Sequence, residues 1–116
     1  MPRRHLSFLE DMRVAAQRVR RYTKDSTFES YEQNQEKIDA TLHNLEIIGE
    51  AAKNIPEDVR ASYPNIPWRN MARFRDVLAH HYFGIDLETV WDIIENELPA
   101  LLSELDTAIK NEENQP

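Results

Sequence analysis

The chain has 116 residues, of which 41% are hydrophobic, so it is long enough for one domain with a single modest core. It contains no cysteine, which excludes a disulfide framework or a thiolate metal site and is typical of a reducing compartment. No segment has the pattern of a signal peptide, and no apolar run is long enough to cross a bilayer. We therefore expect a cytoplasmic protein without a membrane-spanning segment.

The net charge of −7 conceals a strong asymmetry along the chain. Residues 3 to 24 contain seven basic and two acidic side chains, a net charge of +5; the basic residues are Arg3, Arg4, Arg13, Arg18, Arg20, Arg21 and Lys24. A second basic cluster contains Arg69, Arg73 and Arg75. Side by side, the two segments would attract phosphate, as an RNA-binding surface does. Alternatively, they are the solvated faces of helices.

Periodic apolar residues and a scarcity of glycine predict an all-α bundle with four longer helices and short helical turns. The first helix is predicted over 4–22, with two adjoining apolar stripes that indicate burial against more than one neighbour. The capping signal Asp25-Ser-Thr precedes a short helical turn, and the second long helix is predicted over 35–53.

The second long helix has a core stripe made of Ile38, Leu42, Leu45, Gly49 and Ala52. Glycine within a helix costs about 1 kcal/mol relative to alanine, so we expect another helix to approach closely at Gly49. Glu46 and Glu50 lie four residues apart and are expected to share a solvated face with Lys53.

Several prolines lie in the segment between the second and the third long helix. Pro56 starts a short helix that ends before residue 63, and Pro67 lies in the first turn of the third long helix. That helix is predicted to run to about Tyr82 and to close at Gly84 through a left-handed cap.

The final helix is predicted to begin at Asp86 or Leu87 and to carry an apolar face as far as Ile109. Pro99 interrupts its hydrogen-bond ladder and is expected to kink it. The polar tail over 111–116 is expected to fray, so we predict one helical domain over residues 1–110.

The third long helix has two distinct faces. Its apolar stripe is predicted to contain Met71, Phe74, Val77, Leu78 and His81, whereas Arg69, Arg73, Asp76 and His80 share the opposite face. This assignment places His81 in the core and leaves His80 available for chemistry.

The sequence has no glycine-rich phosphate loop and no His-Glu-x-x-His metal pattern, so we expect neither a metal nor a cofactor. Cleavage of RNA without a metal needs a group that moves a proton and a cation that offsets charge on the phosphoryl oxygens. Histidine titrates near neutrality, and arginine offers a planar fork to phosphate. Arg75 and His80 are therefore the candidate pair, with Tyr82 nearby.

Helical geometry limits how these three residues can meet. Arg75 and Tyr82 are about 20° apart around the helix axis, but Arg75 and His80 are about 140° apart. Two arrangements would bring them together: a two-fold dimer that pairs two copies of the chain, or a distorted last turn before Gly84.

Plainer interpretations of the same residues are also open. An arginine and a histidine five residues apart are usually unrelated surface residues, and Asp76 and His80 could form an ion pair on one helix face. Tyr82 could simply close the helix end against the core, in which case its hydroxyl would not be exposed.

The pattern Arg75-x4-His80-x-Tyr82 resembles the Arg-x4-His-x-Tyr signature of the HepT toxins, a branch of the HEPN superfamily of RNA-cleaving helical domains. The resemblance extends over nearly the whole chain. It includes Asn44-Leu-Glu-Ile-Ile-Gly-Glu-Ala-Ala-Lys53, Tyr63-Pro-Asn-Ile-Pro-Trp68 and the run from Arg75 to Asp86.

This resemblance implies a homodimeric HEPN-type bundle with a composite cleft at the dimer axis and a metal-independent endoribonuclease activity. In that cleft His80 would act as general acid or base, and Arg75 would stabilise the phosphate and the transition state. Arg69, Arg73 and Asp76 are further candidates for contact with RNA phosphates.

The resemblance also implies regulation by a partner. HepT toxins are paired, in type VII toxin–antitoxin systems, with a minimal nucleotidyltransferase, MntA, that attaches AMP to the motif tyrosine, here Tyr82. A phosphodiester at this position would add bulk and negative charge where RNA phosphate binds. Two alternatives are kept: a non-catalytic helical module that binds a nucleotide or a nucleotidyltransferase partner, and a dimeric scaffold.

Overall fold

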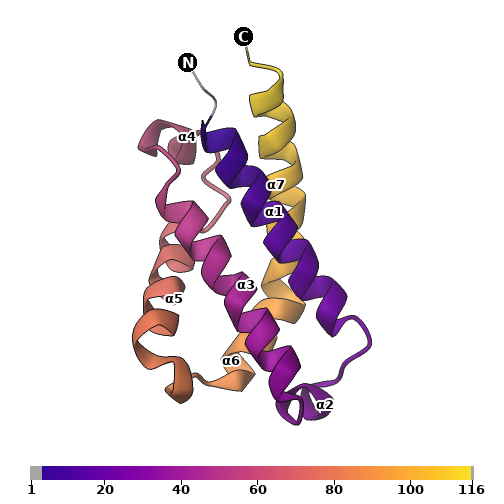
Figure 1. Ribbon diagram of the computed structural model, residues 1–116. Helices are drawn as coiled ribbons and strands as arrows, with labels where there is room; N and C mark the ends of the chain where they lie inside the picture. The colour runs from indigo at the N-terminus through magenta and orange to yellow at the C-terminus, as the bar shows by residue number, and fades with distance from the viewer. Residues whose placement is uncertain (1–3, 116) are drawn as a thin grey trace.

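The computed structural model describes residues 4–115, and this part of the chain is made of helices joined by short loops, with no strand (Figure 1). The helices are α1 (Arg4–Thr23), α2 (Phe28–Glu32), α3 (Gln35–Lys53), α4 (Glu57–Ser62), α5 (Trp68–His81), α6 (Leu87–Asp92) and α7 (Leu98–Glu113). A 3-10 turn, η1 (Tyr82–Gly84), follows α5, and a π-helical turn, η2 (Ile93–Glu97), joins α6 to α7. The predicted all-α fold is confirmed. Arg3 of the basic segment and Pro116 of the tail lie outside the described residues.

Short polar side chains cap the starts of α2, α3 and α6. Thr27 and Ser30 form a reciprocal capping box at α2, in which each hydroxyl accepts a hydrogen bond from the other's backbone N–H at 3.1 and 3.0 Å. The side chain of Asn34 accepts from the backbone N–H of Lys37 at 3.0 Å and caps α3. Asp86 caps α6 in the same way. Because capping is a local signal, the predicted starts of these three helices agree with the structure.

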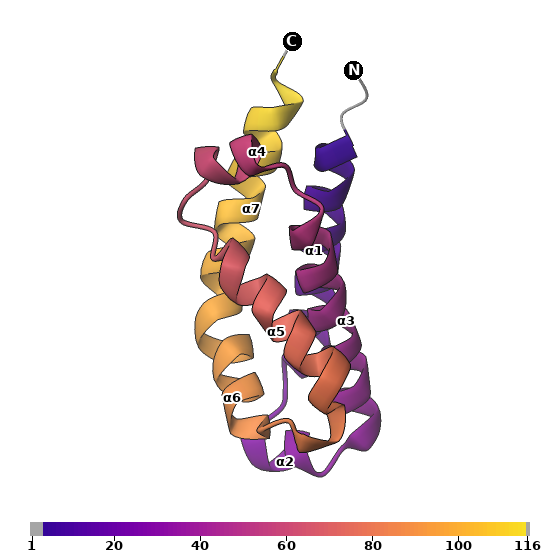
Figure 2. The ribbon, with the colours of Figure 1, turned by 90° about the vertical axis from the view of Figure 1, so that its left-hand side faces the viewer.

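Three long helical stretches build the core. Helix α1 packs along α3 and along α7, while α5 crosses the other side of α3 (Figures 1 and 2). One predicted stripe on α1 is buried (Leu9, Met12, Ala16 and Val19), and so are Ile38, Leu42, Leu45 and Ala52 of the α3 stripe. In the adjoining stripe of α1, Ala15 is buried, whereas Phe8 and Tyr22 are half-buried. No helix within the described residues is both long enough and apolar enough to cross a membrane.

The final helical stretch changes its hydrogen-bond pattern just before Pro99. Proline has no N–H, and its ring clashes with the carbonyl four residues earlier, so a regular ladder cannot continue through it. The wider π-helical turn of η2 precedes the proline, which lies in the first turn of α7. Arg20 Nη1 donates a hydrogen bond to the Ile94 carbonyl in this turn at 3.1 Å. The predicted interruption is therefore present as a change of helix type.

The C-terminal end of α7 is tied to the rest of the bundle. Tyr63 Oη donates a hydrogen bond to Glu112 Oε2 at 2.6 Å, and His5 Nε2 lies 2.6 Å from Glu112 Oε1. These contacts link the loop after α4 and the start of α1 to the last turns of α7. As a consequence, residues 111–113 of the tail that we expected to fray belong to the helix.

Candidate functional site

The position of α5 depends on Gly49 of α3. A Cβ atom at Gly49 would lie 2.4 Å from Arg75 Cβ and 2.6 Å from the Met71 carbonyl oxygen, both far inside van der Waals contact. Only glycine allows the two helices to come this close. The predicted close approach at Gly49 is confirmed, and the residue that it accommodates is the candidate arginine.

Arg75 is held at the edge of the α3–α5 contact by acidic neighbours. Its Nε lies 2.9 Å from Glu50 Oε2, and its Nη1 lies 3.5 Å from Asp76 Oδ1. The Nε atom is buried but is not aligned for a hydrogen bond, so the Glu50 contact is an attraction between charges. The side chain is 31% exposed, which leaves part of the guanidinium accessible to a ligand.

Lys53 completes this charged group, which we call the Arg75 charge cluster (Glu50, Lys53, Arg75 and Asp76). Lys53 Nζ donates a hydrogen bond to Asp76 Oδ1 at 2.9 Å. This hydrogen bond is the main cause of a lowered pKa for the Asp76 carboxyl. Glu50 and Lys53 therefore do more than form the solvated face that we predicted, because each contacts a residue of α5. The alternative Asp76–His80 ion pair is absent from the described residues.

Both histidines at the end of α5 are exposed. The predicted burial of Val77 and His81 in the apolar stripe is wrong, because the side chains that pack on α3 are Met71, Arg75 and Leu78 of α5 and Tyr82 of η1. Gly49 makes room for the stem of Arg75, and a long charged side chain can bury its stem while its head remains at the surface. The helix is thereby rotated so that His81 points outward.

Helix α5 is regular from Arg75 to His80, and the backbone departs from helical geometry only at His81, with φ −136° and ψ 35°. The distorted turn therefore lies beyond both motif residues and does not bring them together. Within the described residues, no hydrogen bond or ion pair joins Arg75 to His80. The left-handed cap predicted at Gly84 is also wrong, since no glycine there has a positive φ and the helix ends in a 3-10 turn instead.

Tyr82 combines a partly buried ring with a hydroxyl at the surface. The ring packs edge-on against Phe83, with centroids 5.4 Å apart, and Oη donates a hydrogen bond to Asp39 Oδ1 at 2.7 Å. Gln35 Nε2 donates to the same oxygen of Asp39 at 2.9 Å. Burial, followed by the hydrogen bond and the charge of Asp39, raises the pKa of Tyr82 to about 12. The hydrogen bond from Tyr82 in turn lowers the pKa of the Asp39 carboxyl.

Sequence reasoning missed Asp39 and understated Glu50. Asp39 lies 43 residues before its partner Tyr82, and no local pattern predicts a contact over such a separation. Glu50 belongs to the stretch that resembles the HepT toxins, which was a signal that could have directed attention to it.

The other candidate phosphate contacts have mixed surroundings. Arg69 and Arg73 are exposed on α5 and make no ion pair with a described residue, whereas Asp76 is engaged in the Arg75 charge cluster. Helices α1 and α5 lie on different sides of α3, so the two basic segments do not lie side by side within one chain (Figures 1 and 2). Part of the α1 charge is paired, with Arg13 and Arg20 contacting acidic residues of the final helical stretch.

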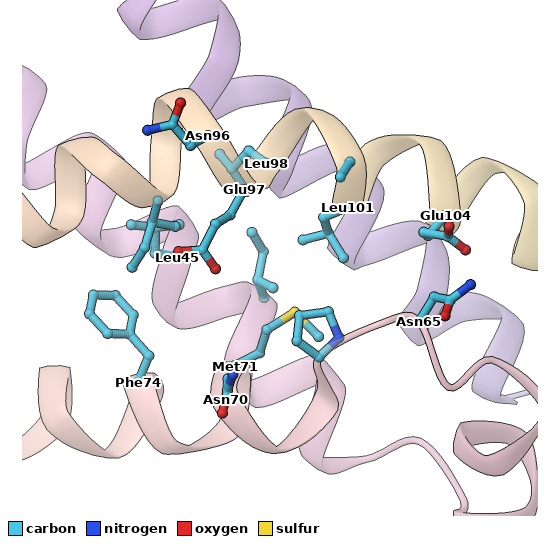
Figure 3. Close-up of a pocket in the computed structure, with 14 residues that line it drawn as sticks. Leu45, Asn65, Asn70, Met71, Phe74, Asn96, Glu97, Leu98, Leu101 and Glu104 are labelled. Carbon is cyan, nitrogen blue, oxygen red and sulfur yellow. The ribbon is translucent and has the colours of Figure 1, made fainter.

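A cavity of about 340 Å³ lies between α5 and the η2–α7 stretch (Figure 3). Its lining is mainly apolar and includes Leu45, Met71, Phe74, Leu98 and Leu101. The three motif residues are not part of the lining, so this cavity is separate from the candidate site. The described residues contain no group of three His, Asp or Glu side chains placed to hold a metal ion.

The fold and the site together define an all-α bundle that carries an arginine and an exposed histidine on α5 and a tyrosine in the 3-10 turn that follows it. The chain belongs to the HepT-like family: the model of the family described as "Ribonuclease HepT-like" matches residues 12–108. The family and the HEPN-type bundle expected from the sequence are thus confirmed.

Two relatives show the extent of this similarity. The chain is 40% identical to a "putative RNase" of Methanocaldococcus jannaschii, over 99% of this chain and 96% of the relative. It is 42% identical to a "probable ribonuclease HepT" of Thermococcus cleftensis, over 87% of this chain and 92% of the relative. No solved structure matches the chain significantly.

Proposed function

We propose that this chain is a metal-independent endoribonuclease toxin whose active site is a cleft between two copies of the chain. His80 is the proton carrier: it takes the proton from the 2'-hydroxyl as that oxygen attacks phosphorus, or gives one to the leaving 5'-oxygen. Arg75 offsets the negative charge that builds on the phosphoryl oxygens. The observation that carries this proposal is that one helix of a HepT-like chain presents both an exposed His80 and a partly exposed Arg75.

A dimer can bring an arginine and a histidine of the motif into one cleft, which a single regular helix cannot do. Val77 and Phe83, on either side of the two histidines, are 38% and 101% exposed, so they add apolar surface beside the motif. A second copy that covers them would place its own α5 beside the first. Arg75 of one chain then shares a cleft with His80 of the partner subunit. Exposed Arg69 and Arg73 bind the RNA phosphates that flank the cleaved bond.

Regulation acts through Tyr82 in this proposal. A minimal nucleotidyltransferase antitoxin transfers AMP to the hydroxyl, which lies at a surface contact with Asp39. The ring can still pack on its neighbours, so the packing role and the acceptor role of Tyr82 are compatible. The added phosphodiester places negative charge and a bulky nucleoside beside the RNA-binding cleft, where both oppose RNA binding.

The test is RNA cleavage by the purified chain in excess EDTA. We expect cleavage by the wild-type chain, and no cleavage by Arg75→Ala or His80→Ala when both variants keep their helical circular dichroism. Matched controls are Arg18→Ala and His43→Ala, which remove an exposed arginine and an exposed histidine from other helices. Cleavage retained by both Arg75→Ala and His80→Ala would remove the proposed mechanism.

One observation favours the non-catalytic alternative. Arg75 is already neutralised by Glu50 and Asp76, as expected of a residue whose role is to hold α5 against α3. In that case the chain would bind a nucleotidyltransferase tightly but leave RNA intact. The same EDTA assay, combined with a pull-down of the nucleotidyltransferase, separates the two functions.

A further inference from the structure

Two tyrosines of the described residues donate a hydrogen bond to a carboxylate, and their surroundings differ. Tyr63 bonds to Glu112, whose side chain is only 12% exposed and whose second oxygen contacts His5. The Glu112 carboxylate is therefore shielded by contacts that join the loop after α4 and the start of α1 to the end of α7. Tyr82 bonds to Asp39, an exposed residue on the surface of α3. The Tyr82 hydroxyl therefore lies where an incoming group can reach it.

One oxygen of the Asp39 carboxylate, Oδ1, is held within hydrogen-bond distance of the Tyr82 hydroxyl. Both hydrogen bonds to this carboxylate, from Tyr82 Oη at 2.7 Å and from Gln35 Nε2 at 2.9 Å, meet at Oδ1. Gln35 lies one turn earlier on α3, so it orients the carboxylate from its own helix. No lysine or arginine among the described residues forms an ion pair with Asp39, and its negative charge is not offset by a neighbouring cation.

A phenol needs such a base when it attacks phosphorus near neutral pH. The pKa of Tyr82 is raised to about 12, so the hydroxyl is almost entirely protonated under physiological conditions. The pKa of Asp39 is lowered, chiefly by the hydrogen bond from Tyr82, so the carboxylate is ionised and already accepts that hydrogen bond. A base placed within hydrogen-bond reach of the nucleophile typically accelerates such a step by about 10²–10⁴-fold.

We propose that Asp39 is the proton acceptor for Tyr82 in AMP transfer, an inference that rests on the proposed modification of Tyr82. The co-reactant is a nucleoside triphosphate, ATP. Tyr82 Oη attacks the α-phosphorus, the new Oη–P bond forms, and the bond from phosphorus to the bridging oxygen breaks. Pyrophosphate leaves with that electron pair, and the phenolic proton passes to Asp39 Oδ1. Because Asp39 is exposed, the proton is then lost to solvent.

This role makes Asp39 a catalytic residue for the modification of Tyr82 and not for RNA cleavage. Asp39 lies on α3 and touches Tyr82, whereas the proposed ribonuclease groups are Arg75 and His80 on α5. Loss of the carboxylate should therefore leave the toxin active and make it resistant to neutralisation. If the Asp39–Tyr82 contact only held α3 against η1, its loss would not impair AMP transfer while leaving RNA cleavage unchanged.

The experiment compares Asp39→Asn with the wild-type chain. Asparagine keeps an oxygen that accepts the Tyr82 hydrogen bond but cannot take its proton. Each chain is incubated with ATP, Mg²⁺ and a minimal nucleotidyltransferase that modifies the wild type, and the gain of one AMP is followed by intact mass. We expect Asp39→Asn to be modified about 100-fold more slowly, with unchanged thermal unfolding and unchanged RNA cleavage. Asp39→Glu should recover part of the rate.

The matched control is Glu46→Gln, which removes a nearby negative charge that acts on Tyr82 without a hydrogen bond. It should be modified at close to the wild-type rate. Equal rates for the wild type and Asp39→Asn would overturn the role of Asp39 while leaving modification of Tyr82 intact. If no minimal nucleotidyltransferase adds AMP to the wild type, or Tyr82→Phe still gains it, the proposed regulation fails, and the role of Asp39 fails with it.

Discussion

Replacement of Gly49 by alanine tests the contact that positions the candidate arginine. The new methyl carbon would lie 2.4 Å from Arg75 Cβ and 2.6 Å from the Met71 carbonyl oxygen. Since carbon atoms in contact prefer 3.5–4.0 Å, α5 must retreat from α3 by about 1 Å. The Met71 oxygen belongs to the backbone, so rotation of a side chain cannot relieve the clash. The whole helix has to move.

Two effects of opposite sign determine the stability of this variant. Alanine recovers about 1 kcal/mol of helix propensity relative to glycine, while overpacking of a tight contact costs about 1–3 kcal/mol. With a backbone atom in the clash we expect the upper part of that range, hence a net loss of about 1–2 kcal/mol. The melting temperature should fall by about 4–8 °C for each kcal/mol lost.

The assay is thermal unfolding followed by circular dichroism, with Gly84→Ala as the matched control. No atom lies within 4 Å of a Cβ at Gly84, and its φ is not positive, so alanine there should be neutral or stabilising. A 1 Å displacement of Arg75 should also reduce RNA cleavage about 100-fold at a temperature where the variant is folded. If Gly49→Ala instead melts higher than the wild type, the close approach of α3 and α5 is refuted.

Three further predictions concern other contacts. Thr41→Val should cost about 1–3 kcal/mol, because it removes the partner of the buried Tyr31 hydroxyl, 2.6 Å away; urea unfolding showing no loss would contradict this. Tyr63 and Tyr82 each have a pKa of about 12 in the folded chain, against 10 when unfolded, so their contribution to stability is complete below pH 10 and is lost as pH rises towards 12. A variant with both tyrosines changed to phenylalanine should therefore show a smaller decrease in urea midpoint over this range, and an equal decrease would count against the shifts. Phe83→Ser should convert the proposed dimer to a monomer in sedimentation velocity without loss of helix, whereas an unchanged sedimentation coefficient would place the dimer contact elsewhere.

Helix α3 shows how much of the fold can be read locally. Its bounds, 35–53, coincide with the prediction, since Asn34 caps its start and the prolines that follow prevent its continuation. Its apolar stripe is buried as expected, and the one glycine in the stripe marks a close helix contact. Each of these properties depends on residues within a few turns of one another.

The surroundings of the candidate site could not be predicted in this way. His81 was assigned to the core because it completed an apolar stripe, but the packing of Arg75 against Gly49 rotates α5 and exposes it. The ending of α5 was expected to need a left-handed glycine, yet a 3-10 turn closes it. In both cases the outcome depends on how α5 meets α3, a contact between segments distant in sequence.

The sequence by itself determined the all-α class, the positions of the helices and the Arg75, His80 and Tyr82 signature of the family, because helix periodicity, capping and motif spacing are local properties. Only the tertiary structure decided that Arg75 faces Glu50 and that the Tyr82 hydroxyl donates a hydrogen bond to Asp39. Those partners come from α3, and the free energy that brings α3 and α5 together comes from apolar burial across the whole interface. The electrostatic environment of the site is a consequence of that packing.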